Sequence, residues 1–134
     1  MSDIYNDETY LKNNPGWHEE GAEFKTGKII SLLERNPVAI KTVCEVGCGS
    51  GEILVQLEKK LAKDIQFTGL DISKDAIGIA KKKETEKIKF ELKDVATETG
   101  TFDLILVIDV IEHIDNYFRF LDTIATKSSY TIFH

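Results

Sequence analysis

A glycine-rich turn with an acid at its entry is the part of this chain best suited to hold a ligand. Residues 42–51 read TVCEVGCGSG: a run rich in β-branched residues, an acid, and then glycine at every second position. A strand that enters such a turn and continues into a helix brings bare backbone N–H groups up to a ligand. The acid, Glu45, would repel a pyrophosphate and attract a cationic amino group. The turn therefore favours an amino-acid-like ligand over a nucleotide phosphate.

The glycine spacing also differs from that of a dinucleotide-binding turn. The fingerprint G-x-G-x-x-G places glycine or alanine at the sixth position, where this chain has Glu52. By itself G-x-G-x-G is a weak signal, so its interpretation depends on the residues downstream.

Four predicted strands each have an acid at or just after their carboxyl end. The strands are predicted at 42–46, 66–71, 88–92 and 102–108. The acids are Glu45, Asp71, Asp94 and Asp109. In an open parallel sheet the ligand crevice lies outside these ends, and an acid after the second strand can accept both hydroxyl protons of a ribose. Together with the turn, this pattern favours S-adenosylmethionine.

Helical spacing and capping residues predict the elements between the strands. Ser73 is an N-cap for a helix over 74–83, in which Ala76, Ile77, Ile79 and Ala80 face the core. A helix over 20–35 is expected to bury Phe24, Ile29, Ile30 and Leu33. Asp115 is expected to cap a helix over 116–127 with Phe118, Leu121 and Ile124 facing inward, before a strand begins at Tyr130.

These segments resemble the class I S-adenosylmethionine-dependent methyltransferases, within the group of small methyltransferase domains. The matching stretches are 43–51, 69–73, 93–95 and 102–105 running on to 109–114. The resemblance implies an α/β fold, a Rossmann-like doubly wound parallel sheet with strands 3-2-1-4-5 present. A complete fold would have the order 3-2-1-4-5-7-6, so strands 6 and 7 are expected to be missing and strand five to be an exposed edge open to self-association.

The same resemblance implies one domain and a set of cofactor contacts. Residues 1–134 form a single methyltransferase domain, incomplete at its carboxyl end, with a lid segment and helix at 1–36 and a cofactor-binding core at 37–134. Within the lid, contacts to cofactor or substrate from Tyr10, Trp17 or His18 are an alternative to simple packing of Trp17 on the sheet edge. The expected cofactor-binding residues are Glu45, Gly47, Cys48, Gly49, Gly51, Asp71, Ile72, Asp94, Val95, Ile108 and Asp109.

The cluster Asp109-x-x-Glu112-His113 leaves three roles open. It is a structural helix start, or His113 is a general base assisted by Glu112, since an imidazole titrates near neutral pH. Alternatively Asp109, Glu112 and His113 bind a divalent metal, an arrangement similar to that of small-RNA 2′-O-methyltransferases, although those usually carry Glu where this chain has Asp. We expect one of the first two roles, and thus no metal.

Composition limits the partners. A net charge of −6 disfavours a nucleic-acid partner, and no apolar stretch approaches the length of a membrane span. The acidic amino-terminal residues are no secretory signal, and together with only two cysteines they predict the cytoplasm. The expected function is methyl transfer from S-adenosylmethionine to an unidentified nucleophile. The alternatives are a cofactor-binding module without turnover and a metal-assisted RNA or small-molecule O-methyltransferase; an NAD-binding dehydrogenase domain is undercut by Glu52.

Overall fold

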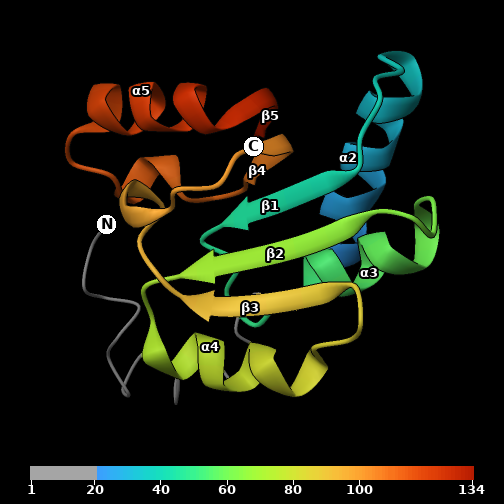
Figure 1. Ribbon diagram of the computed structural model, residues 1–134, viewed down its shortest axis with the longest axis horizontal. Helices are drawn as coiled ribbons and strands as arrows, with labels where there is room; N and C mark the ends of the chain where they lie inside the picture. Colours follow the sequence, from blue (N-terminus) through green and yellow to red (C-terminus); the bar gives the residue numbers. More distant parts are fainter. Residues whose placement is uncertain (1–20) are drawn as a thin grey trace.

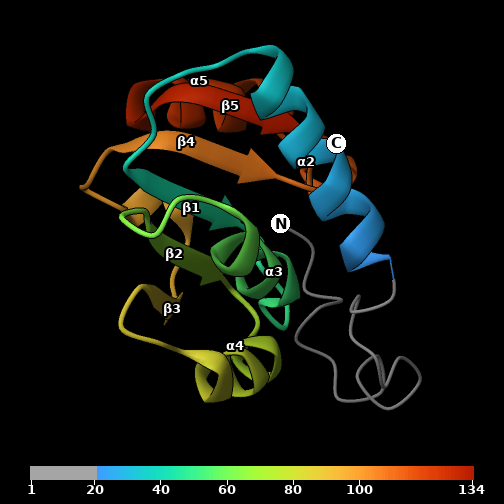
Figure 2. The same ribbon diagram turned by 90° about the vertical axis from the view of Figure 1, so that its right-hand side faces the viewer.

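Residues 21–134 are described by the computed structural model, and they form a five-stranded parallel sheet with helices on both faces (Figures 1 and 2). The strands are β1 (Thr42–Val46), β2 (Gln66–Asp71), β3 (Ile88–Leu92), β4 (Phe102–Val107) and β5 (Ser128–Phe133). Their order in the sheet is β3-β2-β1-β4-β5. The predicted α/β doubly wound sheet with the order 3-2-1-4-5 is therefore confirmed. Tyr10, Trp17 and His18 lie outside the described residues.

The connecting helices agree closely with the predicted ranges. They are α2 (Ala22–Arg35), α3 (Glu52–Lys60), α4 (Lys74–Ala80) and α5 (Tyr117–Lys127). Single 3₁₀ turns are η2 (Lys81–Lys83), η3 (Val95–Thr97) and η4 (Ile111–His113). The helix predicted over 74–83 is thus α4 followed directly by η2, and the predicted N-cap is present: Ser73 Oγ accepts the Ala76 N–H at 3.2 Å.

Side chains alternate between two apolar layers, as buried parallel strands require. One layer packs α2, α3 and α4 against the sheet and includes Phe67, Phe90 and Leu106. The other packs α5 against Cys44, Ile105 and Val107 through Ile124. Figure 2 shows α2 and α3 together on one face and α5 on the other.

A polar tie at the amino ends of two central strands sets their register. Asp103 Oδ2 accepts the backbone N–H groups of Lys41 and Thr42 at 2.7 and 3.1 Å, and the Asp103 N–H donates to Thr42 Oγ1 at 2.9 Å. Backbone donors lower the pKa of Asp103, so the carboxylate stays charged. The tie aligns Val43 with Leu104 and brings the carboxyl ends of β1 and β4 to the same level.

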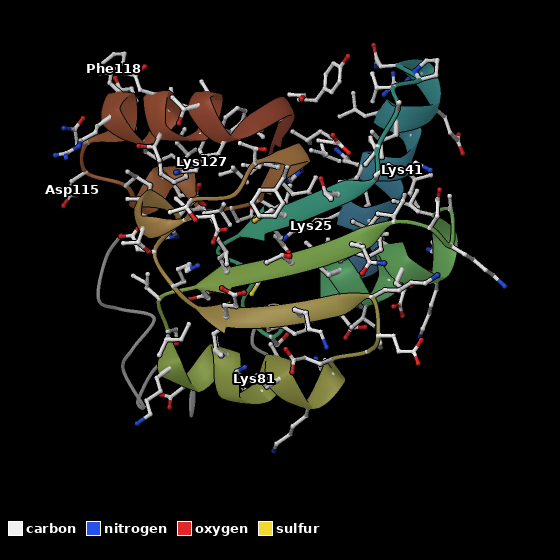
Figure 3. The ribbon with its side chains drawn as sticks, in the orientation of Figure 1. Lys25, Lys41, Lys81, Asp115, Phe118 and Lys127 are labelled. Carbon is white, nitrogen blue, oxygen red and sulfur yellow. The ribbon has the colours of Figure 1, made fainter. Side chains whose placement is uncertain are left out.

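Two aromatic residues predicted to face the core are instead exposed. Phe24 on α2 is 64% exposed and Phe118 on α5 is 68% exposed, and Figure 3 shows Phe118 on the outer side of α5. Helix phase explains both errors. In α2 the buried stripe is Ala22, Thr26 and Ile29, and a residue two positions from the start of such a stripe points to the opposite side.

The predicted cap of the last helix is also wrong by one residue. Asn116, not Asp115, occupies the N-cap position, where its side-chain oxygen accepts the Arg119 N–H at 3.2 Å. Asp115 instead lies in the loop before the cap, where it lines a cavity described below.

This assignment can be tested by stability measurements. Asn116→Ala should lower the free energy of unfolding by about 1 kcal/mol, because an N–H at the helix start loses its acceptor. Asp115→Ala is the matched control and should change stability by less than about 0.5 kcal/mol. Urea unfolding followed by circular dichroism measures both, and an equal or larger loss in the Asp115 variant would contradict the assignment.

Candidate functional site

The carboxylate of Asp71 joins the glycine turn to the end of β2. Asp71 Oδ2 accepts the Gly49 N–H at 2.9 Å, and Oδ1 accepts the Ser73 N–H at 2.8 Å. The residue is only 6% exposed. A carboxylate has about four acceptor positions, enough for backbone donors and a ribose diol together. Two backbone N–H groups therefore orient the carboxylate of Asp71, the residue predicted to bind the ribose.

The backbone N–H groups of the turn, however, are not bare. Those of Gly47 and Cys48 both donate to the Leu70 carbonyl, at 2.7 and 3.0 Å, and that of Gly51 donates to the Cys48 carbonyl at 3.0 Å. With Gly49 bound to Asp71, four of the N–H groups are used within the protein. The expectation that they point at a ligand is wrong for these four, because the turn folds back onto β2.

Glycine is required in the turn by conformation and by space. Gly47, Gly49 and Gly51 all have positive φ, at 74°, 57° and 85°, which side chains rarely tolerate. A Cβ at Gly47 would also lie 2.5 Å from Val110 Cγ2. The backbone of the turn therefore packs closely against Val110, which follows the end of β4.

A cavity of about 240 Å³ lies beside the turn, at the carboxyl ends of β1, β2 and β3. Five predicted cofactor residues line it: Gly47, Asp71, Ile72, Asp94 and Val95. Asp94 is exposed, and its Oδ1 accepts the Ala96 N–H at 2.9 Å, which orients the carboxylate. The cavity thus combines apolar side chains, at Ile72 and Val95, with the carboxyl groups of Asp71 and Asp94 on the side of β2 and β3.

The opposite wall of this cavity comes from residues that sequence reasoning missed. The start of α5 and the loop before it contribute Ile114, Asp115, Asn116, Arg119, Phe120 and Thr123. The only sequence signal for them was the N-cap pattern itself, which places a helix start after β4 but not over the end of β2.

Glu45 lies inside the protein. It is 2% exposed, and its Oε1 has no hydrogen-bond partner. Burial, helped by repulsion from Asp71, holds the pKa of Glu45 well above its usual range, although Lys25 opposes the shift. A buried acceptor without a donor is unusual in a folded protein, and Glu45 does not line the cavity beside the turn.

Lys25, which sequence reasoning also missed, reaches from α2 to the end of β4. Its ammonium group forms an ion pair with Asp109. Asp109 has φ 56° and also lies 3.4 Å from His134 Nδ1, while its N–H donates to the His134 carbonyl at 2.9 Å. Burial opposes ionisation of Asp109, but the bonds to Lys25 and His134 outweigh it and lower its pKa. Ile108, Lys25 and His134 line a second hollow of about 290 Å³.

The predicted catalytic pair is only loosely formed. His113 Nε2 lies 3.8 Å from Glu112 Oε1, and both side chains are partly exposed on η4. Asp109 is bound to Lys25 instead of joining them. Within residues 21–134, no three His, Cys, Asp or Glu side chains are arranged to hold a metal ion, so Asp109, Glu112 and His113 do not converge as a ligand set.

Both cysteines belong to the core. Cys44 and Cys48 are buried and unpaired with each other, and burial raises the pKa of both thiols. Cys48, expected to be a cofactor-binding residue, belongs to the apolar layer that α3 covers and does not line the cavity beside the turn.

Comparison with known proteins finds sequences that are similar to this chain. The family model described as "Methyltransferase domain" matches residues 17–130. A mitochondrial ubiquinone biosynthesis O-methyltransferase of Saccharomyces cerevisiae is 35% identical over 62% of this chain and 28% of its own length. Norajmaline N-methyltransferase of Rauvolfia serpentina is 34% identical over 60% of this chain and 30% of its own. This chain therefore spans under a third of these two relatives.

Solved structures share the fold. The plantazolicin methyltransferase BpumL, solved with SAH, superposes with a TM-score of 0.79 at 20% identity, over 94% of this chain and 51% of that one. Magnesium protoporphyrin IX methyltransferase from Synechocystis PCC 6803, also solved with SAH, superposes with a TM-score of 0.72 at 18% identity, over 94% of this chain and 65% of that one.

None of the helices between residues 21 and 134 combines the length and the apolar character that a membrane span requires.

The buried Glu45 makes a prediction about pH. A carboxyl whose pKa is raised on folding contributes stability below its unfolded pKa and loses it as pH rises through the folded value. The free energy of unfolding of the wild type should therefore fall relative to Glu45→Gln as pH rises above about 5, by up to about 1.4 kcal/mol per pH unit.

Urea unfolding of both proteins at pH 5, 6, 7 and 8 measures this difference. The contribution of Asp109 has the opposite sign but is common to both proteins, so it cancels. A difference that stays constant across the range would show that Glu45 is charged in the folded protein.

Proposed function

Because this chain belongs to the methyltransferase domain family, we propose that it binds S-adenosylmethionine along the carboxyl ends of β1 to β4 and transfers its methyl group to an acceptor. The observation that carries the proposal is Asp71, fixed by the Gly49 and Ser73 N–H groups at the edge of a cavity that Asp94 and Ile72 also line. The activity of a longer protein that contains this chain, its acceptor and its partners are part of the proposal.

The adenosine half fits the cavity beside the turn. Asp71 would accept both ribose hydroxyl groups through charge-assisted hydrogen bonds. Ile72 would pack on the adenine ring, and the exposed carboxylate of Asp94 would accept from its exocyclic amine, with Val95 behind it. Arg119 and Phe120 of α5 would enclose the base from the other side, since they line the same cavity.

The amino-acid half would lie across the turn toward β4. Glu45 offers an unpaired buried acceptor for the ammonium group, and Lys25 offers a cation on the same side. The backbone at Ile108 and Asp109 would border this end. Two acids, Asp71 and Asp109, stand beside the cation of Lys25 at this edge of the sheet. This balance suits a zwitterion better than a polyphosphate, which is why we favour this ligand over NAD.

Catalysis would consist mainly of positioning. The sulfonium group makes the bound methyl electrophilic, so the protein must align an acceptor nucleophile for in-line attack and accept its proton. We propose His113 as the group that takes this proton, with Glu112 beside it, because η4 begins four residues after the end of β4. Asp109 and His134 form the alternative acid–imidazole pair.

Specific observations also support alternatives to this proposal. A cofactor-binding module without turnover is the alternative for this length of chain, since it spans only part of its relatives. The relatives methylate oxygen or nitrogen by name, so the attacked atom stays open. Relatives named as mitochondrial and chloroplastic leave the cytoplasmic location a prediction, as is the absence of a nucleic-acid partner.

Replacement of Asp71 tests the cofactor site. Asp71→Asn should weaken binding of S-adenosylhomocysteine at least about tenfold, because two charge-assisted bonds to the ribose lose their charge. Asp64→Asn is the control: it removes a carboxylate that pairs with Lys41 at the opposite ends of the strands. Calorimetry measures both affinities, and an Asp71 variant that binds as tightly as the control would remove Asp71 from the site.

Replacement of His113 tests the proposed proton acceptor. His113→Gln should lower kcat by about 10²–10⁴-fold and leave the affinity for S-adenosylhomocysteine within about twofold. A panel of phenolic, catecholic and amine acceptors is assayed by methyl transfer with His134→Gln in parallel. If only the His134 variant is slow, the proton goes to the pair of His134 and Asp109 instead.

A further inference from the structure

Phe90 lies at the centre of β3 and is 1% exposed, yet it lines neither of the hollows described above. Its N–H donates to Glu84 Oε2 at 2.8 Å, which holds this strand in place at the sheet edge. In the sheet Phe90 pairs with Gly69, and Gly69 pairs with Glu45. Residues paired in this way point to the same face, so the ring lies on the face toward which Glu45 points.

Two glycines leave the space that the ring fills. A Cβ on Gly69 would lie 2.5 Å from Phe90 Cδ1, and a Cβ on Gly51 would lie 2.4 Å from Phe90 Cζ. Both separations are far below the van der Waals contact of carbon atoms. The near side of the ring therefore rests on Gly69 and its far end reaches Gly51, the last glycine of the turn. The Cys48 Cβ closes the same space, 3.0 Å from the Gly69 position.

Gly51, the third glycine of the turn, is therefore needed for packing against Phe90 as well as for the turn itself. Gly51 lacks a side chain because an aromatic ring from another strand occupies that position. The spacing in the turn and the aromatic residue on β3 are thus one structural unit, although 39 positions separate them in the sequence.

We propose that Phe90 is a positioning residue for the cofactor: its ring supports the Gly47–Gly51 turn from the core side and keeps the Gly49 N–H on Asp71. Three residues of the turn are glycines with positive φ, so the turn has little stiffness of its own. Close packing beneath it supplies that stiffness. The predicted effect on cofactor affinity rests on the proposed function; the effect on the turn does not.

A matched pair of substitutions tests the proposal. Phe90→Leu removes the outer ring atoms that reach Gly51. Phe67→Leu makes the same change on the same face of the sheet, two residues before Gly69 on β2, where Phe67 is 2% exposed. Each variant is titrated with S-adenosylhomocysteine by calorimetry, and hydrogen exchange of the Gly49 amide is measured by NMR without ligand.

Phe90→Leu should weaken S-adenosylhomocysteine binding at least about tenfold and speed exchange of the Gly49 amide at least about tenfold, whereas Phe67→Leu should change each by less than about threefold. Urea unfolding confirms that the two variants have similar global stability. Equal effects of the two substitutions on the Gly49 amide would overturn the proposal.

A compensating substitution tests the contact itself. Gly69→Ala places a methyl group against the ring at a position whose φ an alanine can adopt, and it should speed Gly49 exchange. Adding Phe90→Ala should make exchange slower than the two single effects combined would give, because alanine lacks Cδ1 and Cε1, the atoms that lie 2.5 and 2.7 Å from the added methyl group. Gly78→Ala, in open space on α4, should leave Gly49 unchanged. Additive effects of the two substitutions would overturn the contact.

The two readouts separate this proposal from the proposed function. If the wild type fails to bind S-adenosylhomocysteine while the Gly49 amide still depends on Phe90, the proposed function fails and the support of the turn stands. If the wild type binds and Phe90→Leu binds equally well, the positioning role fails and the proposed function stands.

Discussion

The pairing of Asp71 with the Gly49 amide is the interaction on which the rest of the site depends. It connects the turn after β1 with the end of β2, at 2.9 Å, and the second oxygen of the same carboxylate holds the Ser73 amide at the start of α4. One buried charge therefore fixes the turn, the strand end and the next helix together. Buried carboxylates are stable only with such donors, so the groups that would contact a ribose are also those that shape the protein.

The charges at this edge of the sheet are arranged unevenly. Glu45 is buried with an unpaired oxygen, and burial, followed by repulsion from Asp71, raises the pKa of its carboxyl group. Lys25 is bound to Asp109, on the side toward β5. An ammonium group near Glu45, as proposed for the amino-acid end of the cofactor, would supply the donor that Oε1 lacks and would favour the charged form of this carboxyl group.

Much of this could be predicted from the sequence, and the failures have physical causes. Strand positions follow from short apolar runs that each end in an acid, and the sheet order follows from the resemblance to the class I methyltransferases. The exposure of Phe24 and Phe118 could not be predicted from their aromatic character. Whether a helical residue is buried depends on which side of the helix it occupies, and a shift of one residue changes that side. The N–H groups of the turn form hydrogen bonds within the protein, and Phe90 fills the space at Gly51. Both features depend on contacts between segments that are distant in the sequence, so the local sequence pattern does not predict them. Lys25 and Arg119 were missed for the same reason.

We propose above that S-adenosylmethionine binds across the turn at the ends of β1 to β4. The most direct test is an NMR titration of the ¹⁵N-labelled chain with S-adenosylhomocysteine, with NAD as the competing ligand. We expect saturable shifts of the amide signals of Gly49, Ile72 and Val95 with S-adenosylhomocysteine and none with NAD. Shifts confined to the hollow between α2 and β5, or saturation by NAD at the turn, would contradict it.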